Sequence, residues 1–75
     1  MKRLADLAIG SRGRVTAIEG NDDVSVRLLE MGLTPGARVA MLGRAPLGDP
    51  LEFELRGYRL SLRRCEAARV EVEPE

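Results

Sequence analysis

The sequence contains no histidine, no tryptophan and a single cysteine, and its aromatic residues are one phenylalanine and one tyrosine. Transition-metal sites are built from clusters of histidine and cysteine, so we expect no metal ligands in this chain. Planar cofactors and single-stranded nucleic acids are bound by stacking on aromatic side chains, which are scarce here. Without histidine, the usual base for a serine or cysteine nucleophile is also missing. The sequence therefore predicts a protein that is not an enzyme and has no cofactor.

Acidic residues remain as a source of catalytic or metal-binding oxygen atoms. Asp49, Glu52, Glu54 and Glu66 offer carboxylates, but no spacing typical of a calcium-binding loop organises them. Alternation along a strand places Glu52 and Glu54 on one outward face, which is weak evidence for acid–base catalysis. We interpret these carboxylates as part of a solvated charged surface.

The only cysteine, Cys65, has no partner for an internal disulfide, which excludes a small extracellular scaffold held together by such bonds. A reducing cytosol is the compartment that fits. Arg63 and Arg64 would favour the thiolate of Cys65, but a partly buried structural cysteine is the preferred interpretation. No apolar run approaches the roughly 20 residues of a membrane-spanning helix, so any action at a membrane requires a partner.

Length and charge limit the architecture and the partners. The 75 residues fit one domain, 1–75, with a small core, because a chain of this size buries only about 60% of its unfolded surface. Its 12 basic and 12 acidic residues give a net charge of zero. Nucleic-acid binding relies on a basic surface that displaces counterions, so nucleic acid is not the expected partner.

The clearest strand pattern covers residues 50–63, where apolar and polar residues alternate on both sides of Arg56-Gly57. Gly57 can adopt the positive φ that a two-residue hairpin turn requires. This register places Phe53 opposite Leu60 on the apolar face. Further strands are predicted at residues 14–18, at 37–42 and from 69 onward. Five short strands indicate a small, mainly β barrel.

One short helix is predicted between the first two of these strands. The residues available to cap its N-terminus are Asn21, Asp22 and Asp23. Val24, Leu28 and Met31 fall on one face, and Gly32 is the expected left-handed end. Near the N-terminus, Leu4, Leu7 and Ala8 predict one side of a helical turn.

Residues 32–50 contain four of the eight glycines and three of the four prolines. Phosphate-binding loops place glycines at fixed spacings before a helix, whereas Gly32 follows one. Pro35 and Gly36 fit the central positions of a type II turn. The segment therefore predicts turns rather than an anion site.

Three segments, "RLLEMGLTPGARV", "APLGDPLEF" and "LSLRRCEAARVEVE", resemble the FeoA family, and the similarity covers nearly the whole chain, from Leu4 to Glu73. Its most specific parts are Gly32, Leu33, Pro35, Gly36 and the loop from Ala45 to Pro50. FeoA proteins are small cytosolic components of bacterial ferrous iron transport. The resemblance implies an SH3-like barrel that acts as a non-enzymatic adaptor. Its implied partner is FeoB, a membrane permease with a cytosolic GTP-binding domain, whose assembly or nucleotide cycle it would alter.

Two other function classes remain open at this stage. Small SH3-like barrels also bind RNA or ribosomal surfaces, although zero net charge and few aromatic residues argue against that alternative. A metal-sensing regulatory domain would need ligands that the sequence lacks.

Docking residues are expected on the helix and in the turns. Leu33 and Leu47 lie in turn regions where apolar side chains are often exposed, near the basic Arg27 and Arg44. Asp49 belongs to the same loop as Leu47. These five residues form the expected partner-binding set. The alternative for the two leucines is that they close the ends of the barrel.

A basic stretch late in the chain could meet an acidic partner surface or the anionic inner leaflet of a membrane. It consists of Arg56, Arg59, Arg63 and Arg64. Glu52 and Glu54 lie across the same hairpin, with Glu54 opposite Arg59, and are expected to neutralise much of it.

Overall fold

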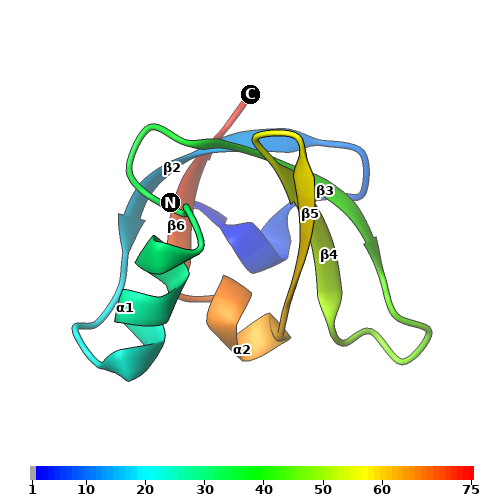
Figure 1. Cartoon of the computed structure of the whole chain (residues 1–75). Coiled ribbons are helices and arrows are strands. Elements are labelled where there is room, and N and C mark those ends of the chain that lie inside the picture. Colours follow the sequence, from blue (N-terminus) through cyan, green and yellow to red (C-terminus); the bar gives the residue numbers. More distant parts are fainter. Residues whose placement is uncertain (1) are drawn as a thin grey trace.

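The computed structural model describes residues 2–75 and shows six antiparallel strands in one sheet, in the order β1-β6-β2-β3-β4-β5. The strands are β1 Lys2–Arg3, β2 Arg12–Ile18, β3 Arg38–Arg44, β4 Leu51–Leu55, β5 Tyr58–Leu62 and β6 Val70–Pro74. The 3-10 turn η1 spans Leu4–Asp6, and the helices are α1 Asp23–Glu30 and α2 Arg64–Ala67. In Figure 1 the sheet arches over η1 and both helices, which lie on its concave side.

The predicted mainly β class and the predicted hairpin are confirmed. β4 and β5 pair with Phe53 opposite Leu60 and Leu55 opposite Tyr58, so Arg56-Gly57 is the two-residue turn between them. Both turn residues have positive φ, 52° at Arg56 and 84° at Gly57, as a type I′ turn requires. Glycine adopts this conformation at no steric cost, which is why Gly57 marks the turn in the sequence.

Several short elements differ from the prediction. The sheet has six strands rather than about five because β1 pairs with β6. A strand of two residues is too short to show an alternating pattern. α2 is a second helix of four residues, little more than one turn, and has no visible periodicity either. The opening turn is a 3-10 helix in which Leu4 and the following Leu7 are buried, whereas Ala8 is exposed.

α1 follows the predicted pattern at its start and on its inner face. Asp22, one of the three candidate caps, accepts a hydrogen bond at Oδ1 from the backbone N–H of Ser25 at 3.2 Å. Leu28 is fully buried, and Val24 and Met31 pack against the core. The apolar spacing therefore identified the side of the helix that faces the sheet.

The end of α1 depends on a close approach between the chain and the hairpin. Gly32 has φ of 105°, and a Cβ at this position would lie 3.0 Å from the Tyr58 hydroxyl and 3.1 Å from Leu55 Cδ2. Both the left-handed backbone and the lack of space therefore require glycine. The turn predicted at residues 34–37 closes through a hydrogen bond from the Ala37 N–H to the Thr34 carbonyl at 3.0 Å.

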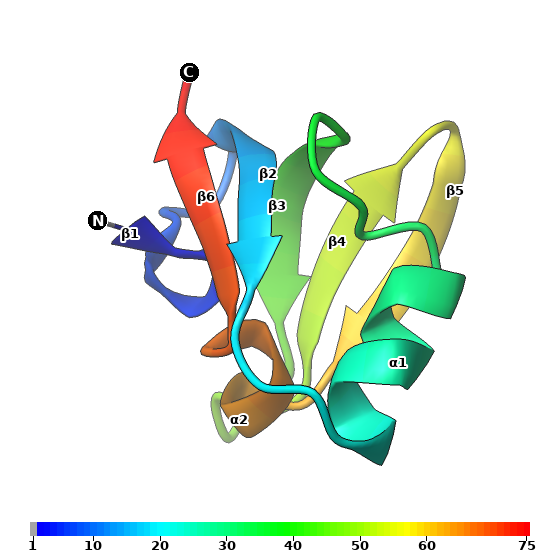
Figure 2. The ribbon, with the colours of Figure 1, turned by 90° about the vertical axis from the view of Figure 1, so that its left-hand side faces the viewer.

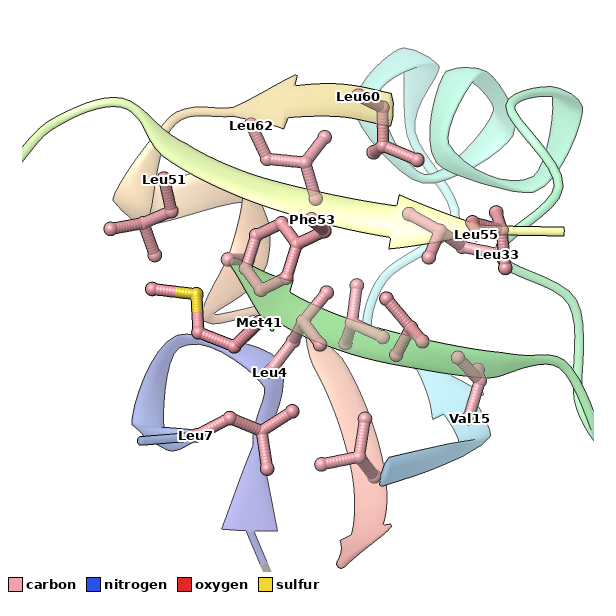
Figure 3. Close-up of a cluster of buried hydrophobic side chains, with 14 of the residues drawn as sticks. Leu4, Leu7, Val15, Leu33, Met41, Leu51, Phe53, Leu55, Leu60 and Leu62 are labelled. Atoms are coloured by element: carbon pink, nitrogen blue, oxygen red, sulfur yellow. The ribbon is translucent and has the colours of Figure 1, made fainter. Parts of the chain in front are cut away.

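A single hydrophobic core joins η1, α1, α2 and strands β2 to β6. Phe53, the only phenylalanine, is fully buried. Figure 3 shows its ring surrounded by Leu51 of β4, Met41 of β3, Leu62 of β5 and Leu4 of η1. The largest apolar side chain of the protein thus fills the centre of the bent sheet.

Replacing Phe53 by alanine should lower the free energy of unfolding by about 3–5 kcal/mol, because the substitution removes buried apolar surface and leaves a cavity. Urea unfolding measures this loss. Phe53→Leu should lose less, and Glu54→Ala, on the exposed side of the same strand, should change stability by less than about 0.5 kcal/mol. Equal effects of Phe53→Ala and Glu54→Ala would contradict the register of β4.

Candidate docking surface

α2 lies between α1 and the loop that joins β3 to β4, as Figure 1 shows. On one side, the Arg27 guanidinium of α1 pairs with the Glu66 carboxylate of α2 at 2.5 Å. On the other side, Asp49 Oδ1 accepts a hydrogen bond from the backbone N–H of Arg64 at 2.8 Å, and the Gly48 carbonyl accepts one from the Arg64 guanidinium at 3.0 Å. We call α1, α2 and residues 45–50 the helix–loop face.

The loop of residues 45–50 is held in one shape while its apolar side chain points outward. The Ala45 N–H donates to the Pro50 carbonyl at 3.0 Å, and the Gly48 N–H donates to the Ala45 carbonyl at 2.7 Å. Leu47 is 96% exposed, so the predicted exposure of this residue is confirmed. The loop therefore presents a leucine to solvent on a backbone that is already ordered.

Two basic residues lie next to the loop that carries Leu47. Arg44 ends β3 and is exposed, and Arg63 stands at the start of α2, where it lines a shallow pocket with Asp49 and Pro50. In the part of the chain that the structure describes, neither arginine forms a salt bridge with a carboxylate. Exposed apolar groups and arginines are both found in protein interfaces.

Leu33 is not exposed, and the expectation that it would be is wrong. The residue is fully buried, and its N–H donates to the Leu28 carbonyl at 3.2 Å. The chain turns inward after Gly32, so the Leu33 side chain joins the core. The alternative that this leucine closes the barrel is the arrangement observed.

Two other members of the expected set have structural partners. The guanidinium of Arg27 is engaged with Glu66, and the carboxylate of Asp49 accepts from the backbone of α2. The structure thus leaves Arg44 and Leu47 as the members that are both exposed and unengaged. Whether any of the five contacts a partner stays a prediction.

Cys65 is exposed on α2, so its predicted partial burial is also wrong. The buried position of this short helix is Ala67, two residues further on and on the other side of the turn. Across residues 2–75, no three His, Cys, Asp or Glu side chains gather closely enough to hold a metal ion. No helix in this range is long and apolar enough to cross a membrane.

Val26 and Leu29 are exposed apolar residues that the sequence reasoning missed. They are 50% and 41% exposed on the outer side of α1. The helical period that places Leu28 inside places Val26 outside, so the same pattern contained the signal. These two side chains extend the apolar surface of the helix–loop face.

A second ion pair connects the start of α1 to the turn before β6. Both oxygens of Asp22 accept hydrogen bonds from the Arg69 guanidinium, at 2.6 and 2.8 Å. These bonds, followed by the N–H of Ser25, lower the pKa of Asp22 from 3.8 to about 2. In the neighbouring pair the backbone N–H of Arg63, followed by the Arg27 guanidinium, lowers the pKa of Glu66. The carboxylates are thus charged at neutral pH and connect α1 to α2 and β6.

Asp22→Asn should make the free energy of unfolding depend less on pH under acidic conditions. Because the folded pKa of Asp22 lies below its ordinary value, the ion pair stabilises the fold above about pH 4 and is lost as the pH falls toward about 2. We expect wild-type stability to fall more steeply over this range than that of the variant, as measured by urea unfolding. Asp23→Asn is the matched control, and parallel profiles for wild type and Asp22→Asn would disprove the role of the pair.

Asp49→Ala should loosen the connection between the loop and α2. The change removes the acceptor for the Arg64 N–H and should lower stability by about 1 kcal/mol. Hydrogen exchange at the Arg64 amide should accelerate. Asp49→Asn keeps an acceptor oxygen and should behave more like wild type. Unchanged exchange at Arg64 in the alanine variant would show that this bond does not hold the loop.

The sheet, its core and the exposed helix–loop face define a class of protein: a small, mainly β barrel with an exposed leucine on an ordered loop. The family model described as FeoA domain matches residues 2–74. The chain belongs to the FeoA family.

Solved structures of the family share the fold. The solution structure of FeoA from Chlorobium tepidum is 38% identical, with a TM-score of 0.89, and the match covers 97% of this chain and 70% of that one. The crystal structure of Stenotrophomonas maltophilia FeoA complexed with zinc is 31% identical, with a TM-score of 0.86 and coverage of 97% and 91%. That protein is described as a prokaryotic SH3 domain protein, so the expected SH3-like barrel is confirmed. A manganese-dependent transcriptional repressor, at 18% identity and a TM-score of 0.89, shares the fold alone.

A curated relative joins two proteins in one chain. It is the Fe(2+) transport protein A/Fe(2+) transporter FeoB fusion protein of Porphyromonas gingivalis, 38% identical over 71 residues. The match covers 95% of this chain and 8% of the relative. The chain thus corresponds to a small part of that protein.

Proposed function

We propose that this chain is a non-enzymatic adaptor of ferrous iron uptake that docks on the cytosolic side of a FeoB-type GTPase permease. The fusion protein of P. gingivalis supports this partner, because fusion holds two domains at high effective concentration. The S. maltophilia relative has been suggested to act as a bacterial ferrous iron transport activating factor. An adaptor of this kind changes the assembly or the nucleotide cycle of the permease through contact alone.

The exposure of Leu47 is the main observation behind our proposal that the loop of residues 45–50 contacts the permease. A leucine that is 96% exposed leaves apolar surface in water, and an apolar pocket on the partner would remove it. The hydrogen bonds that hold the loop lower the entropic cost of ordering it on binding. Arg44, which directly precedes the loop, and Arg63, which lines a pocket with Asp49 and Pro50, favour an acidic partner surface.

Leu47→Ser should abolish association with the permease and leave the fold intact. The side chain has almost no contacts to lose, so stability should change by less than about 0.5 kcal/mol. Association is measured by pull-down of the detergent-solubilised permease, with and without guanine nucleotide. Circular dichroism of each variant confirms that the barrel is folded.

Ile9→Ser is the matched control, because Ile9 is also an exposed large apolar residue, at 58%, but lies outside the helix–loop face. It should bind like wild type. Undiminished binding by a folded Leu47→Ser variant would remove the loop from the proposal and direct the test to Val26 and Leu29. Failure of wild type itself to associate would refute the permease as partner.

A further inference from the structure

β5 is an edge strand with one side of its backbone unused. The sheet order ends at β5, which pairs with β4 on its other side. Figure 2 shows β5 at the border of the sheet, with no further strand beyond it. The Tyr58 hydroxyl donates to the Met31 carbonyl, which ties the start of this strand to the end of α1. The edge is thus formed and anchored before any partner arrives.

The register shows which backbone groups point outward. A two-residue turn makes Leu55 and Tyr58 a hydrogen-bonded pair, and pairs alternate along antiparallel strands. Arg59 and Ser61 therefore occupy positions that are not bonded to β4, and their N–H and C=O groups point away from it. No turn, loop or capping hydrogen bond within residues 2–75 involves these groups. They are the groups that an added strand would engage.

The charged residues of β5 and of the positions that flank it are all arginines, whereas the neighbouring strand β4 carries Glu52 and Glu54. The arginines that form salt bridges are Arg3, Arg14, Arg27, Arg38 and Arg69, and all lie outside β5 and the residues that flank it. Glu52 and Glu54 lie across the hairpin as expected, with Glu54 opposite Arg59, although no salt bridge joins this pair. Arg56, Arg59 and Arg63 are exposed, and their guanidinium groups form no salt bridge in the described part of the chain, although the backbone N–H of Arg63 donates to the Glu66 carboxylate.

This charge distribution indicates which kind of strand can pair with the free edge of β5. Pairing β5 with β5 of a second copy would bring arginines of like charge together along the new ladder, which is unfavourable. A strand with carboxylates at alternate positions would place them next to Arg59 and within reach of the arginines at either end. Because side chains alternate along a strand, the other side chains of the added strand would point toward the inner side of the sheet.

We propose that the β5 edge binds an extended acidic peptide segment by strand addition. The backbones of Arg59 and Ser61 provide the hydrogen bonds, and Arg56, Arg59 and Arg63 bind the carboxylates. This site differs from the loop around Leu47, and the proposal stands whether or not the partner is a permease.

A short synthetic peptide of alternating threonine and glutamate tests the proposal. With isotope-labelled protein at low salt, saturating peptide should slow hydrogen exchange at the Arg59 and Ser61 amides. A twin peptide with glutamine in place of glutamate should bind about tenfold more weakly, and added salt should weaken the glutamate peptide. Arg59→Gln should lower its affinity several-fold. Unprotected Arg59 and Ser61 amides at saturation would overturn the proposal.

Ser61→Pro separates backbone recognition from charge. The Ser61 N–H points away from β4, so proline removes an outward donor and keeps the β4–β5 bonds. This variant should bind the peptide at least about tenfold more weakly, whereas Ser61→Ala, which keeps the N–H, should bind like wild type. Equal binding by a folded Ser61→Pro variant would refute strand addition. If that variant does not fold, amide protection in wild type decides the question. Protection that rises with protein concentration in the absence of peptide would assign the edge to a second copy and overturn the acidic-peptide proposal.

Discussion

The arrangement of the molecule depends on the closure of one bent sheet around Phe53. With a single phenylalanine and no tryptophan, the core has one large ring to fill its centre, and leucines, valines and a methionine complete it. η1, α1 and α2 each bury apolar side chains against this cluster, represented by Leu4, Leu28 and Ala67. Because the chain is so short, these elements each bury one face and leave the other face to solvent.

Polar contacts then set how the outer elements sit relative to one another. Arg69 binds Asp22 at the start of α1, Glu66 binds Arg27 within it, and Asp49 binds the start of α2. The first two are ion pairs with at least one exposed partner, and such pairs contribute little free energy individually, whereas the third is a hydrogen bond from the Arg64 backbone. Their effect is positional: they hold α1, α2 and the loop of residues 45–50 as one face, on which Leu47 projects.

The two proposed binding regions are adjacent through the chain itself. β5 ends at Leu62, and Arg63 leads directly into α2 and the helix–loop face. Arg63 borders both regions, and its exposed guanidinium forms no salt bridge in the described part of the chain. Apart from Arg27 of α1, the arginines with carboxylate partners lie outside both regions, so a protein of zero net charge keeps arginines without salt bridges on β5 and the residues that flank it.

The sequence by itself determined the elements whose pattern repeats over several residues: the β4–β5 hairpin and the inner face of α1. It narrowed the helix cap to three residues, and it left open whether Leu47 is exposed or closes the barrel. It also carried the family resemblance, since the turn around Gly32 and the loop of residues 45–50 are local motifs. Only the tertiary structure decided that Leu33 is buried, that Cys65 is exposed, that Arg27 and Asp49 are engaged, and that β1 completes the sheet. The physical reason is range: periodicity and turn chemistry act between neighbours in sequence, whereas burial and ion pairing join residues far apart in the chain, such as Arg27 and Glu66.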